Sequence, residues 1–222
     1  MTTAHFPIFL DLKARRCLVV GGDDAAAAKA ALLHRAGAEV VIVAETLCPA
    51  LRDAVRCGDA THLARHFSPP LLDGVALVMV AGEILAVSKA VALAARQRGI
   101  PVNVMDDARL SSFIMPAIVE RTPVTIAIST GGASPMLAQL LRQWLDGILP
   151  QRLGHVAALA GHLRERVKRR LRDGIARRRF WERVLSGEPA ALALDGNAAA
   201  AGATLLRALE ESAESPSQAD AA

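Results

Sequence analysis

The chain has 222 residues, enough for one or two domains with a hydrophobic core, and its 52% hydrophobic and 22% charged residues exclude a wholly disordered protein. No apolar run approaches the ~18 residues of a membrane-spanning helix, and the N-terminus lacks the features of a signal peptide. Cys17, Cys48 and Cys57 form no Cys-x-x-Cys pair, which favours a reducing compartment over disulfides or structural zinc. We therefore expect a soluble, cytoplasmic protein.

The net charge of +4 is unevenly distributed. Residues 164–183 contain ten Lys and Arg against three acidic residues, a local charge of +7, so the rest of the chain carries about −3. Such a segment favours an anionic partner. Nucleic acid is one candidate, but aromatic residues make up only 3% of the chain and tyrosine is absent, so few side chains could stack on bases. A solvent-exposed, arginine-rich helix face explains the segment equally well.

Short apolar runs alternate with helical patterns in the first half of the chain. The runs predict strands at 17–21, 40–43, 75–80 and 100–104, and the helical patterns predict helices at 25–36 and 84–98. Strands and helices that alternate at this spacing indicate an α/β fold, a doubly wound parallel sheet with helices on both faces.

The pattern changes near Ser111. Two β-type runs, 113–119 and 124–129, precede a helix predicted over 135–149, for which Ser134 is a suitable N-cap. The two runs either pair with each other within one chain or contribute to contact between two chains.

Apolar spacing after Pro150 is helical throughout, which predicts a small all-α segment. From residue 188 the chain becomes rich in alanine, with one weak helical stretch near 204–211. We expect residues 188–222 to form a largely disordered tail.

The first predicted strand leads into its helix through Gly21-Gly22-Asp23-Asp24-Ala25-Ala26, the position of a dinucleotide-binding fingerprint. That fingerprint, G-x-G-x-x-G/A, needs its first glycine for a tight turn and its second so that the pyrophosphate can approach the backbone. Gly21 and Ala26 match, but Asp23 replaces the middle glycine. An interpretation in which Asp23 or Asp24 only caps the helix is equally consistent with the sequence.

Acidic residues also follow the second and fourth predicted strands. Glu45-Thr46 lies where ribose hydroxyls would bind, although a glutamate after a strand is more often an exposed loop residue. Asp106-Asp107 follows the fourth strand, at the edge where open α/β sheets bind ligands. The pair could act as general acid and base or lie near a metal, or it could cap a turn. The histidines have no metal-ligand spacing, so packing or surface roles are favoured for them.

Seven short segments between residues 5 and 187 occur in the order and spacing of one known family. They are Phe-Pro-Ile-Phe at 6–9, Cys-Leu-Val-Val-Gly-Gly at 17–22, Val-Asn-Val-Met-Asp at 102–106, Ser-Phe-Ile-Met-Pro at 112–116, Ser-Thr-Gly-Gly-Ala-Ser-Pro at 129–135, Leu-Pro-Gln-Arg-Leu-Gly at 149–154 and Arg-Arg-Arg-Phe-Trp-Glu at 177–182. Together they resemble the N-terminal module of siroheme synthase, a precorrin-2 dehydrogenase and sirohydrochlorin ferrochelatase.

The resemblance implies a Rossmann-like NAD domain at 1–110, a β-containing dimerisation region at 111–150 and a helical domain at 151–187 that closes over the tetrapyrrole. It implies that NAD⁺ oxidises precorrin-2 to sirohydrochlorin and that ferrous iron, as a substrate, is inserted in the same cleft. The partners it implies are a second copy of the chain and a tetrapyrrole with eight carboxylates, which suits residues 164–183 better than nucleic acid does. It leaves open a separate methyltransferase as a further partner.

The resemblance also implies site residues. It assigns the acid/base role to Asp106, the nucleotide loop to Gly21, Gly22, Asp24 and Ala25, and the ribose side to Glu45 and Thr46.

The chain departs from the family at Asp23, where a third glycine is usual, and at residues 81–84, where the family has a Thr-Asp loop. These departures leave an alternative function open, that of a chelatase or tetrapyrrole carrier that does not use NAD. An alternative of another class is a basic nucleic-acid-binding or scaffold protein.

Overall fold

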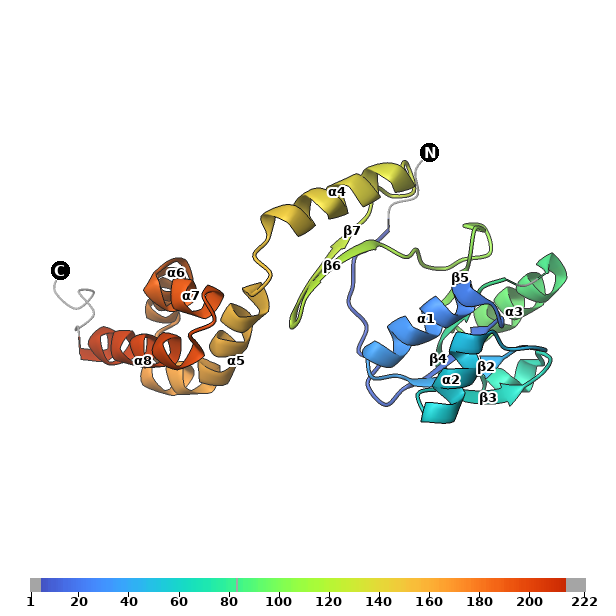
Figure 1. Cartoon of the computed structure of the whole chain (residues 1–222), viewed down its shortest axis with the longest axis horizontal. Coiled ribbons are helices and arrows are strands. Elements are labelled where there is room, and N and C mark those ends of the chain that lie inside the picture. The colour runs from blue at the N-terminus through green and yellow to red at the C-terminus, as the bar shows by residue number, and fades with distance from the viewer. Residues whose placement is uncertain (1–4, 83, 215–222) are drawn as a thin grey trace. The chain divides into compact units, whose positions relative to one another are not determined.

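The computed structural model of the protein describes residues 5–82 and 84–214, which fall into two compact units (Figure 1). The first unit ends at Met115 and the second begins at Pro116. The first unit contains the strands β1 (Arg16–Val20), β2 (Glu39–Val43), β3 (Thr61–Ala64), β4 (Val75–Val80) and β5 (Val102–Val104), the helices α1 (Asp24–Arg35), α2 (Pro49–Cys57) and α3 (Leu85–Gln97), and the 3-10 turn η1 (Pro69–Leu72).

The five strands form a parallel sheet in the order β3-β2-β1-β4-β5. Alternate residues of the central strand β1 point to opposite faces of the sheet. Cys17 and Val19 pack with α1 and α2 on one face, whereas Leu18 and Val20 pack with α3 and η1 on the other. The predicted doubly wound, Rossmann-like sheet is therefore confirmed.

The four strands predicted for the first unit agree with β1, β2, β4 and β5 to within two residues, and the run at 75–80 is β4 itself; β3 was not among them. The largest difference is at β5, which was predicted from 100 and begins at Val102. Pro101 has no N–H to donate to a neighbouring strand, although its carbonyl accepts the Val78 N–H at 2.9 Å. A proline at this point therefore shortens the strand.

The segment after β5 folds back along the outer edge of that strand. The Ser112 N–H donates to the Val102 carbonyl at 2.7 Å, and the Val102 N–H donates to the Ser112 hydroxyl at 2.8 Å. The Val104 N–H donates to the Ser111 hydroxyl at 2.9 Å. These bonds satisfy the backbone of an edge strand and fix both ends of the loop that carries Asp106.

The second unit begins with a hairpin and continues with helices only. Its elements are β6 (Ala117–Arg121), β7 (Val124–Ile128), α4 (Pro135–Ile148), α5 (Leu153–Arg170), α6 (Gly174–Ser186), α7 (Glu188–Leu194) and α8 (Ala198–Glu214). β6 and β7 are antiparallel and pair within one chain. The run predicted at 113–119 starts as a strand only at Ala117, because Phe113 and Met115 pack on the core of the first unit instead.

Two contacts join the hairpin to α4 and α5. The Arg121 side chain is only 8% exposed, and its Nη2 lies 2.9 Å from both the Asp146 carboxylate and the Asp146 carbonyl near the end of α4. A methyl group on Gly154, in the first turn of α5, would overlap the carbonyl oxygens of Arg121 and Thr122. At the other end of α4, the Ser134 hydroxyl accepts the Leu137 N–H at 3.2 Å, as the sequence predicts for an N-cap.

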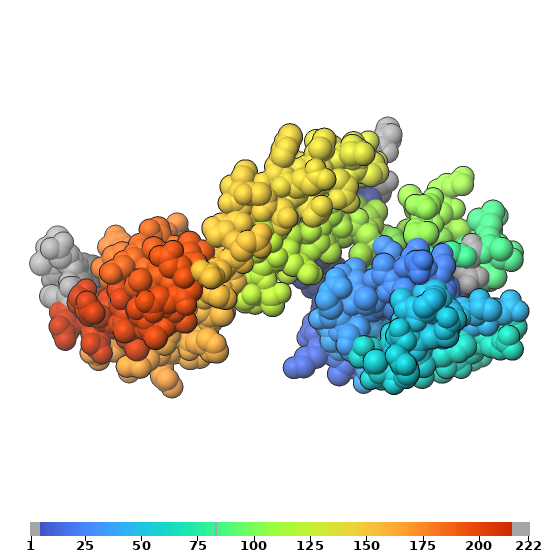
Figure 2. Space-filling model, viewed as in Figure 1, coloured from blue at the N-terminus to red at the C-terminus, as the bar shows by residue number. Residues whose placement is uncertain are grey.

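The expectation of a largely disordered tail is wrong for residues 188–214, which form α7 and α8. Leu205 and Leu209 of α8 are 1% and 2% exposed and pack with Val167 and Phe180. In Figure 2 this part of the chain, orange to red, is closely packed. The helical domain therefore continues to residue 214, and the rest of the predicted tail, 215–222, lies outside the described residues.

Candidate active site

The loops that follow β1, β2, β4 and β5 share one edge of the sheet, since the strands are parallel. Chain order runs outward from β1 to β2 and β3 on one side and to β4 and β5 on the other. The point between β1 and β4 is therefore the topological switch at which open α/β sheets bind ligands. The predicted nucleotide loop, Glu45, Thr46 and Asp106 all lie at this edge.

Close contacts between these loops explain the two glycines at the end of β1. Gly21 has a φ of +135°, and a methyl group on it would overlap the carbonyl oxygen of Ala81, directly after β4. A methyl group on Gly22 would overlap the carbonyl oxygen of Thr46, after β2. The Gly22 carbonyl also accepts the Cys48 N–H at 2.7 Å. Both glycines are thus required by packing, in addition to any role with a nucleotide.

Asp23 is the N-cap of α1. One oxygen of its carboxylate accepts the Ala26 N–H at 2.9 Å, and the other lies against Gly82, where an added methyl group would overlap it. Asp24 is an exposed residue of the first turn. Of the two acids that the sequence offers as helix caps, the structure uses Asp23.

Two features of this loop suit a dinucleotide, and one feature, the Asp23 carboxylate, disfavours it. The tight turn at Gly21 and the exposed carboxylate of Glu45, which has no polar partner among the described residues, match what the cofactor needs. The pyrophosphate would bind at the N-terminus of α1, where the Ala26 N–H already bonds to the Asp23 carboxylate. The residues present therefore suit the cofactor in part, but the Asp23 carboxylate would compete with its phosphates for the Ala26 N–H.

Asp106 and Asp107 have different environments although they are adjacent. Asp107 is partly buried, and its carboxylate accepts the N–H groups of Arg109 at 2.9 Å and Leu110 at 3.2 Å. Asp106 is exposed, with a φ of +61°, and no hydrogen bond or ion pair of its side chain is found among the described residues. The turn-capping interpretation applies to Asp107, and Asp106 has the free carboxylate that acid/base chemistry needs.

The cations of residues 164–183 divide into two groups. Those of α6 mostly hold the helical domain together: Arg177 donates to the Leu171 and Arg172 carbonyls, Arg178 pairs with Glu182 at 2.8 Å, and Arg183 bonds to the Ala208 carbonyl and the Ser212 hydroxyl. Within the described part of the chain, the cations of α5 have no hydrogen bond or ion pair; they are Arg164, Arg166, Lys168, Arg169 and Arg170.

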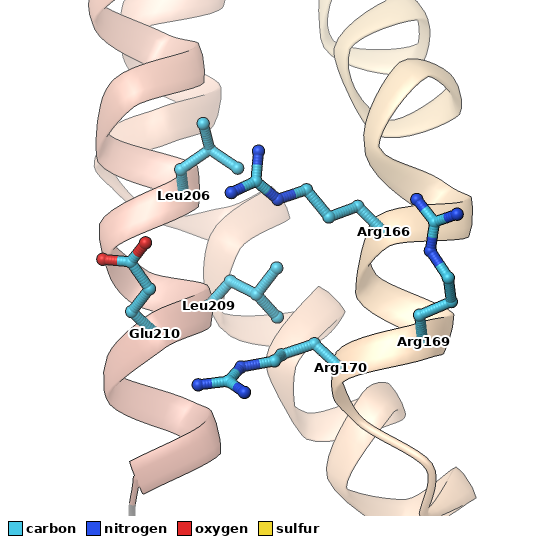
Figure 3. A pocket seen from close by; sticks show the side chains of 6 residues that line it. All are labelled: Arg166, Arg169, Arg170, Leu206, Leu209 and Glu210. Atoms are coloured by element: carbon cyan, nitrogen blue, oxygen red, sulfur yellow. The ribbon is translucent and has the colours of Figure 1, made fainter.

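A pocket of about 330 Å³ lies between α5 and α8 (Figure 3). It is lined by Arg166, Arg169 and Arg170 of α5 and by Leu206, Leu209 and Glu210 of α8. Sequence reasoning singled out the arginines but not the pocket, because α8 was assigned to the tail. The spacing of Ala201, Leu205 and Leu209, four residues apart, is the signal that could have located α8.

No group of three His, Cys, Asp or Glu side chains is arranged to hold a metal ion in residues 5–82 and 84–214. His62 lies 2.9 Å from the Ala44 carbonyl, and His34 lies 3.6 Å from the Asp59 carboxylate. These two histidines therefore have packing and surface roles. Among the helices of residues 5–82 and 84–214, none is long and apolar enough to cross a membrane.

Three family models match successive parts of the chain. Residues 8–117 match the family described as "Putative NAD(P)-binding", residues 121–146 match "Sirohaem biosynthesis protein central", and residues 152–209 match "Sirohaem synthase dimerisation region". The dimerisation name thus falls on α5–α8, not on the segment 111–150 to which the resemblance assigned dimerisation.

The chain is similar to siroheme synthases over nearly its whole length. It is 44% identical to that of Sodalis glossinidius over 210 residues and 46% identical to that of Nitrosospira multiformis over 214 residues. Each match covers 95% of this chain and 45% of the relative. Siroheme synthase 1 of Pectobacterium atrosepticum is 48% identical over 192 residues, 86% of this chain and 40% of the relative. The chain therefore spans less than half the length of these proteins.

The fold is similar to that of a solved structure, "SirC, precorrin-2 dehydrogenase", with a TM-score of 0.70. The match covers 93% of this chain and all of the other, at 22% sequence identity, and so supports the fold alone. The three models follow one another in the order of the observed elements, and the matched siroheme synthases are more than 40% identical to the chain. The chain belongs to the family of the N-terminal module of siroheme synthase.

Proposed function

We propose that the chain acts in siroheme biosynthesis as a precorrin-2 dehydrogenase that uses NAD⁺ to form sirohydrochlorin. The observation that supports this most directly is the free carboxylate of Asp106, at the same sheet edge as the nucleotide loop. Because the chain spans less than half of its siroheme synthase relatives, we propose for it only the chemistry of this module.

In this proposal the loop after β1 and the acid after β2 bind the nucleotide. Gly21 and Gly22 provide a backbone surface without side chains, and Glu45 accepts hydrogen bonds from ribose hydroxyls. NAD⁺, when bound, supplies the acceptor for a hydride. Dehydrogenation of the substrate forms a double bond and releases a hydride and a proton. We assign Asp106 as the group that accepts the proton.

Insertion of ferrous iron is a second proposed step. Iron enters as Fe²⁺ and two pyrrole N–H groups of sirohydrochlorin each lose a proton, so charge and atoms balance without a redox change. The same carboxylate, Asp106, is suited to accept these protons one after the other and to pass each to solvent, because it is exposed and held at the end of β5 by a loop that Ser111 and Ser112 fix.

A second candidate function is that of a chelatase or tetrapyrrole carrier that does not use NAD. One observation favours it: the Asp23 carboxylate lies at the N-terminus of α1, the place of the pyrophosphate. Calorimetric titration with NAD⁺ and spectral titration with sirohydrochlorin distinguish the two. The dehydrogenase binds both compounds, and the carrier or NAD-independent chelatase binds only the tetrapyrrole.

The partner proposed for this chain is a second copy of itself. The exposed side of α4 carries an apolar stripe with a spacing of four residues: Met136, Leu140, Trp144 and Ile148, which are 68%, 39%, 59% and 76% exposed. Large apolar side chains grouped in this way are typical of a contact surface. A separate cytoplasmic methyltransferase is a further candidate partner, as the supplier of the methylated substrate.

The test of the dehydrogenase is direct. Purified protein incubated with precorrin-2 and NAD⁺ should form NADH and sirohydrochlorin in equal amounts, as measured by their absorbance. A gel-shift assay with duplex DNA at the same ionic strength tests the nucleic-acid alternative, for which we expect no specific complex.

A further inference from the structure

We propose that the pocket between α5 and α8 is a binding site for a polycarboxylate with an apolar body. The chemical identity of its ligand rests on the proposed function, because a tetrapyrrole with several carboxylates belongs to this class. The existence of the site rests on the geometry of the two helices alone.

The pocket combines cations with an apolar floor (Figure 3). Arg166 and Arg170 stand one helical turn apart on α5, and their side chains extend toward α8. Leu206 and Leu209 of α8 face them across the pocket. Leu209 belongs to the core of the helical domain at 2% exposure, so the floor is a fixed part of the fold.

The guanidinium groups of the pocket have no hydrogen-bond or ion-pair partner in residues 5–82 and 84–214. Among the described residues no hydrogen bond or ion pair involves Arg166, Arg169 or Arg170, and Glu210, the acid in the lining, is in ion-pair contact with none of them. The C-terminal dipole of α5 accounts for cations in its last turn, such as Arg169 and Arg170. It does not account for Arg166, nor for side chains that extend toward a neighbouring helix.

The arginines of α6 provide a contrast within the same domain. Arg177 and Arg183 donate to backbone carbonyls, and Arg178 pairs with Glu182. The charge of α6 is thus largely used by the fold, whereas that of the pocket is available to a ligand. Of the basic segment 164–183, it is therefore mainly the part on α5 that has cations available to bind an anionic ligand.

The lining indicates the class of ligand. Guanidinium groups bind carboxylates with two parallel hydrogen bonds, and leucine side chains suit the apolar surface that carries those carboxylates. A volume of about 330 Å³ is at the lower end of the ~300–1,000 Å³ of ligand pockets, so it would hold one edge of a macrocycle. Nucleic acid is less suitable, because Phe180 and Trp181 lie edge to face with ring centroids 5.2 Å apart and pack with the core.

Uroporphyrin, a porphyrin with eight carboxylates, is a stable probe for this site. Its binding to the full chain can be followed by fluorescence at fixed ionic strength. The double substitution Arg166→Gln and Arg170→Gln should weaken binding tenfold or more. The matched control is Arg178→Gln with Arg179→Gln on α6, which removes the same charge outside the pocket and should change affinity less than threefold.

A third variant tests whether removal of a negative charge from the pocket increases affinity for uroporphyrin. Glu210→Gln removes the negative charge from the lining and should tighten uroporphyrin binding by a few-fold, a gain that misfolding cannot produce. The proposal is overturned if the parent chain does not bind uroporphyrin, if the α5 and α6 variants lose affinity equally, or if Glu210→Gln leaves affinity unchanged. Any of these results is compatible with intact oxidation of precorrin-2, so failure here is distinguishable from failure of the proposed function.

Discussion

The Asp23 carboxylate lies between the N-terminus of α1 and the backbone of Gly82, two points on opposite sides of the switch between β1 and β4. A side chain at position 82 would overlap that carboxylate, and the φ of +69° at Gly82 also favours glycine. The acid after β1 and the glycine after β4 are thus matched to each other. Because the pyrophosphate of a dinucleotide would bind beside them, we expect this pair to influence how readily an anion binds there.

Substitution of Asp23 by glycine should tighten NAD⁺ binding by tenfold or more. A carboxylate ~5 Å from a phosphate charge is repelled by roughly 3 kcal/mol at an effective dielectric of ~20, and solvent screening reduces this figure. Replacement of an N-cap aspartate by glycine destabilises a helix by only a few tenths of a kcal/mol, so the fold should persist. Isothermal calorimetry measures the affinity.

The control for this prediction is Asp24→Gly, which removes an exposed acid from the same turn without touching Gly82. An equal gain from both substitutions would mean that only net charge matters. NAD⁺ binding at micromolar concentration by the parent, unchanged in Asp23→Gly, would show that the carboxylate does not oppose the cofactor.

Asp106→Asn should lower the rate of sirohydrochlorin formation by 10²- to 10⁴-fold, the usual contribution of a general acid or base. Asparagine is chosen because, like aspartate, it tolerates the left-handed conformation at this position, where φ is +61°. Asp107→Asn is the comparison: its carboxylate accepts backbone N–H groups, which an amide oxygen can also accept, so the rate should change little. A loss below tenfold for Asp106→Asn would restrict that residue to a structural role.

Trp144→Glu on α4 should convert a dimer to a monomer at micromolar concentration, as measured by light scattering. Tryptophan is often among the residues that contribute most to an interface, and an obligate dimer buries ~2,000 Å² or more. The control is Ile175→Glu on α6, which charges an exposed apolar position, 65% exposed, within residues 152–209. Dissociation by Ile175→Glu but not by Trp144→Glu would place the interface on the helical domain instead.

Burial raises the pKa of the Cys17 thiol to about 11, and the positive charge of Arg15 opposes this shift in part. The native state therefore keeps a proton that the unfolded chain releases above pH 9, so the free energy of unfolding should fall as pH rises from about 9 to about 11. One proton limits the slope to about 1.4 kcal/mol per pH unit. The chain has no tyrosine to add to this window.

Urea unfolding at several pH values between 8 and 11 measures this slope. Cys17→Ala should remove most of the difference between neutral and alkaline stability, although it lowers stability at every pH by leaving space in the core. Parallel stability curves for the parent and the variant would contradict a buried, protonated thiol.

The α/β class and most strands of the first unit could be predicted because local pattern determines them. The run at 75–80 is bounded by polar or small residues and is buried at every position but Ala76, so its ends are visible in the sequence. α8 was predicted only in part, as the weak stretch at 204–211, for the opposite reason: seven of its 17 residues are alanines, and among its large side chains Leu205 and Leu209 mark the buried side. Alanine favours a helix without showing which face is covered.

In the candidate site, too, the features set by local sequence could be predicted, and those that depend on packing could not. The sequence places Gly21, Glu45 and Asp106 after strands, and parallel pairing then brings those loops to one edge. Their roles stay predictions. The residue pattern alone could not separate Asp106 from Asp107, although the family resemblance assigned the acid/base role to Asp106. The physical difference depends on which carboxylate the N–H groups of Arg109 and Leu110 reach. The sequence also could not reveal the contact of Asp23 with Gly82, which requires the packing of β1 beside β4.

The hydroxyl groups of Ser111 and Ser112 have a consequence for how the protein behaves at high concentration. An open sheet can grow when an unpaired edge accepts a strand from another molecule, which is a common start of aggregation. Here the N–H groups of Val102 and Val104 are already taken by serine oxygens, and the Val102 carbonyl is taken by the Ser112 N–H. Strand addition at β5 is therefore blocked by the same short segment that holds the Asp106 loop, so solubility and the candidate site depend on one set of hydrogen bonds.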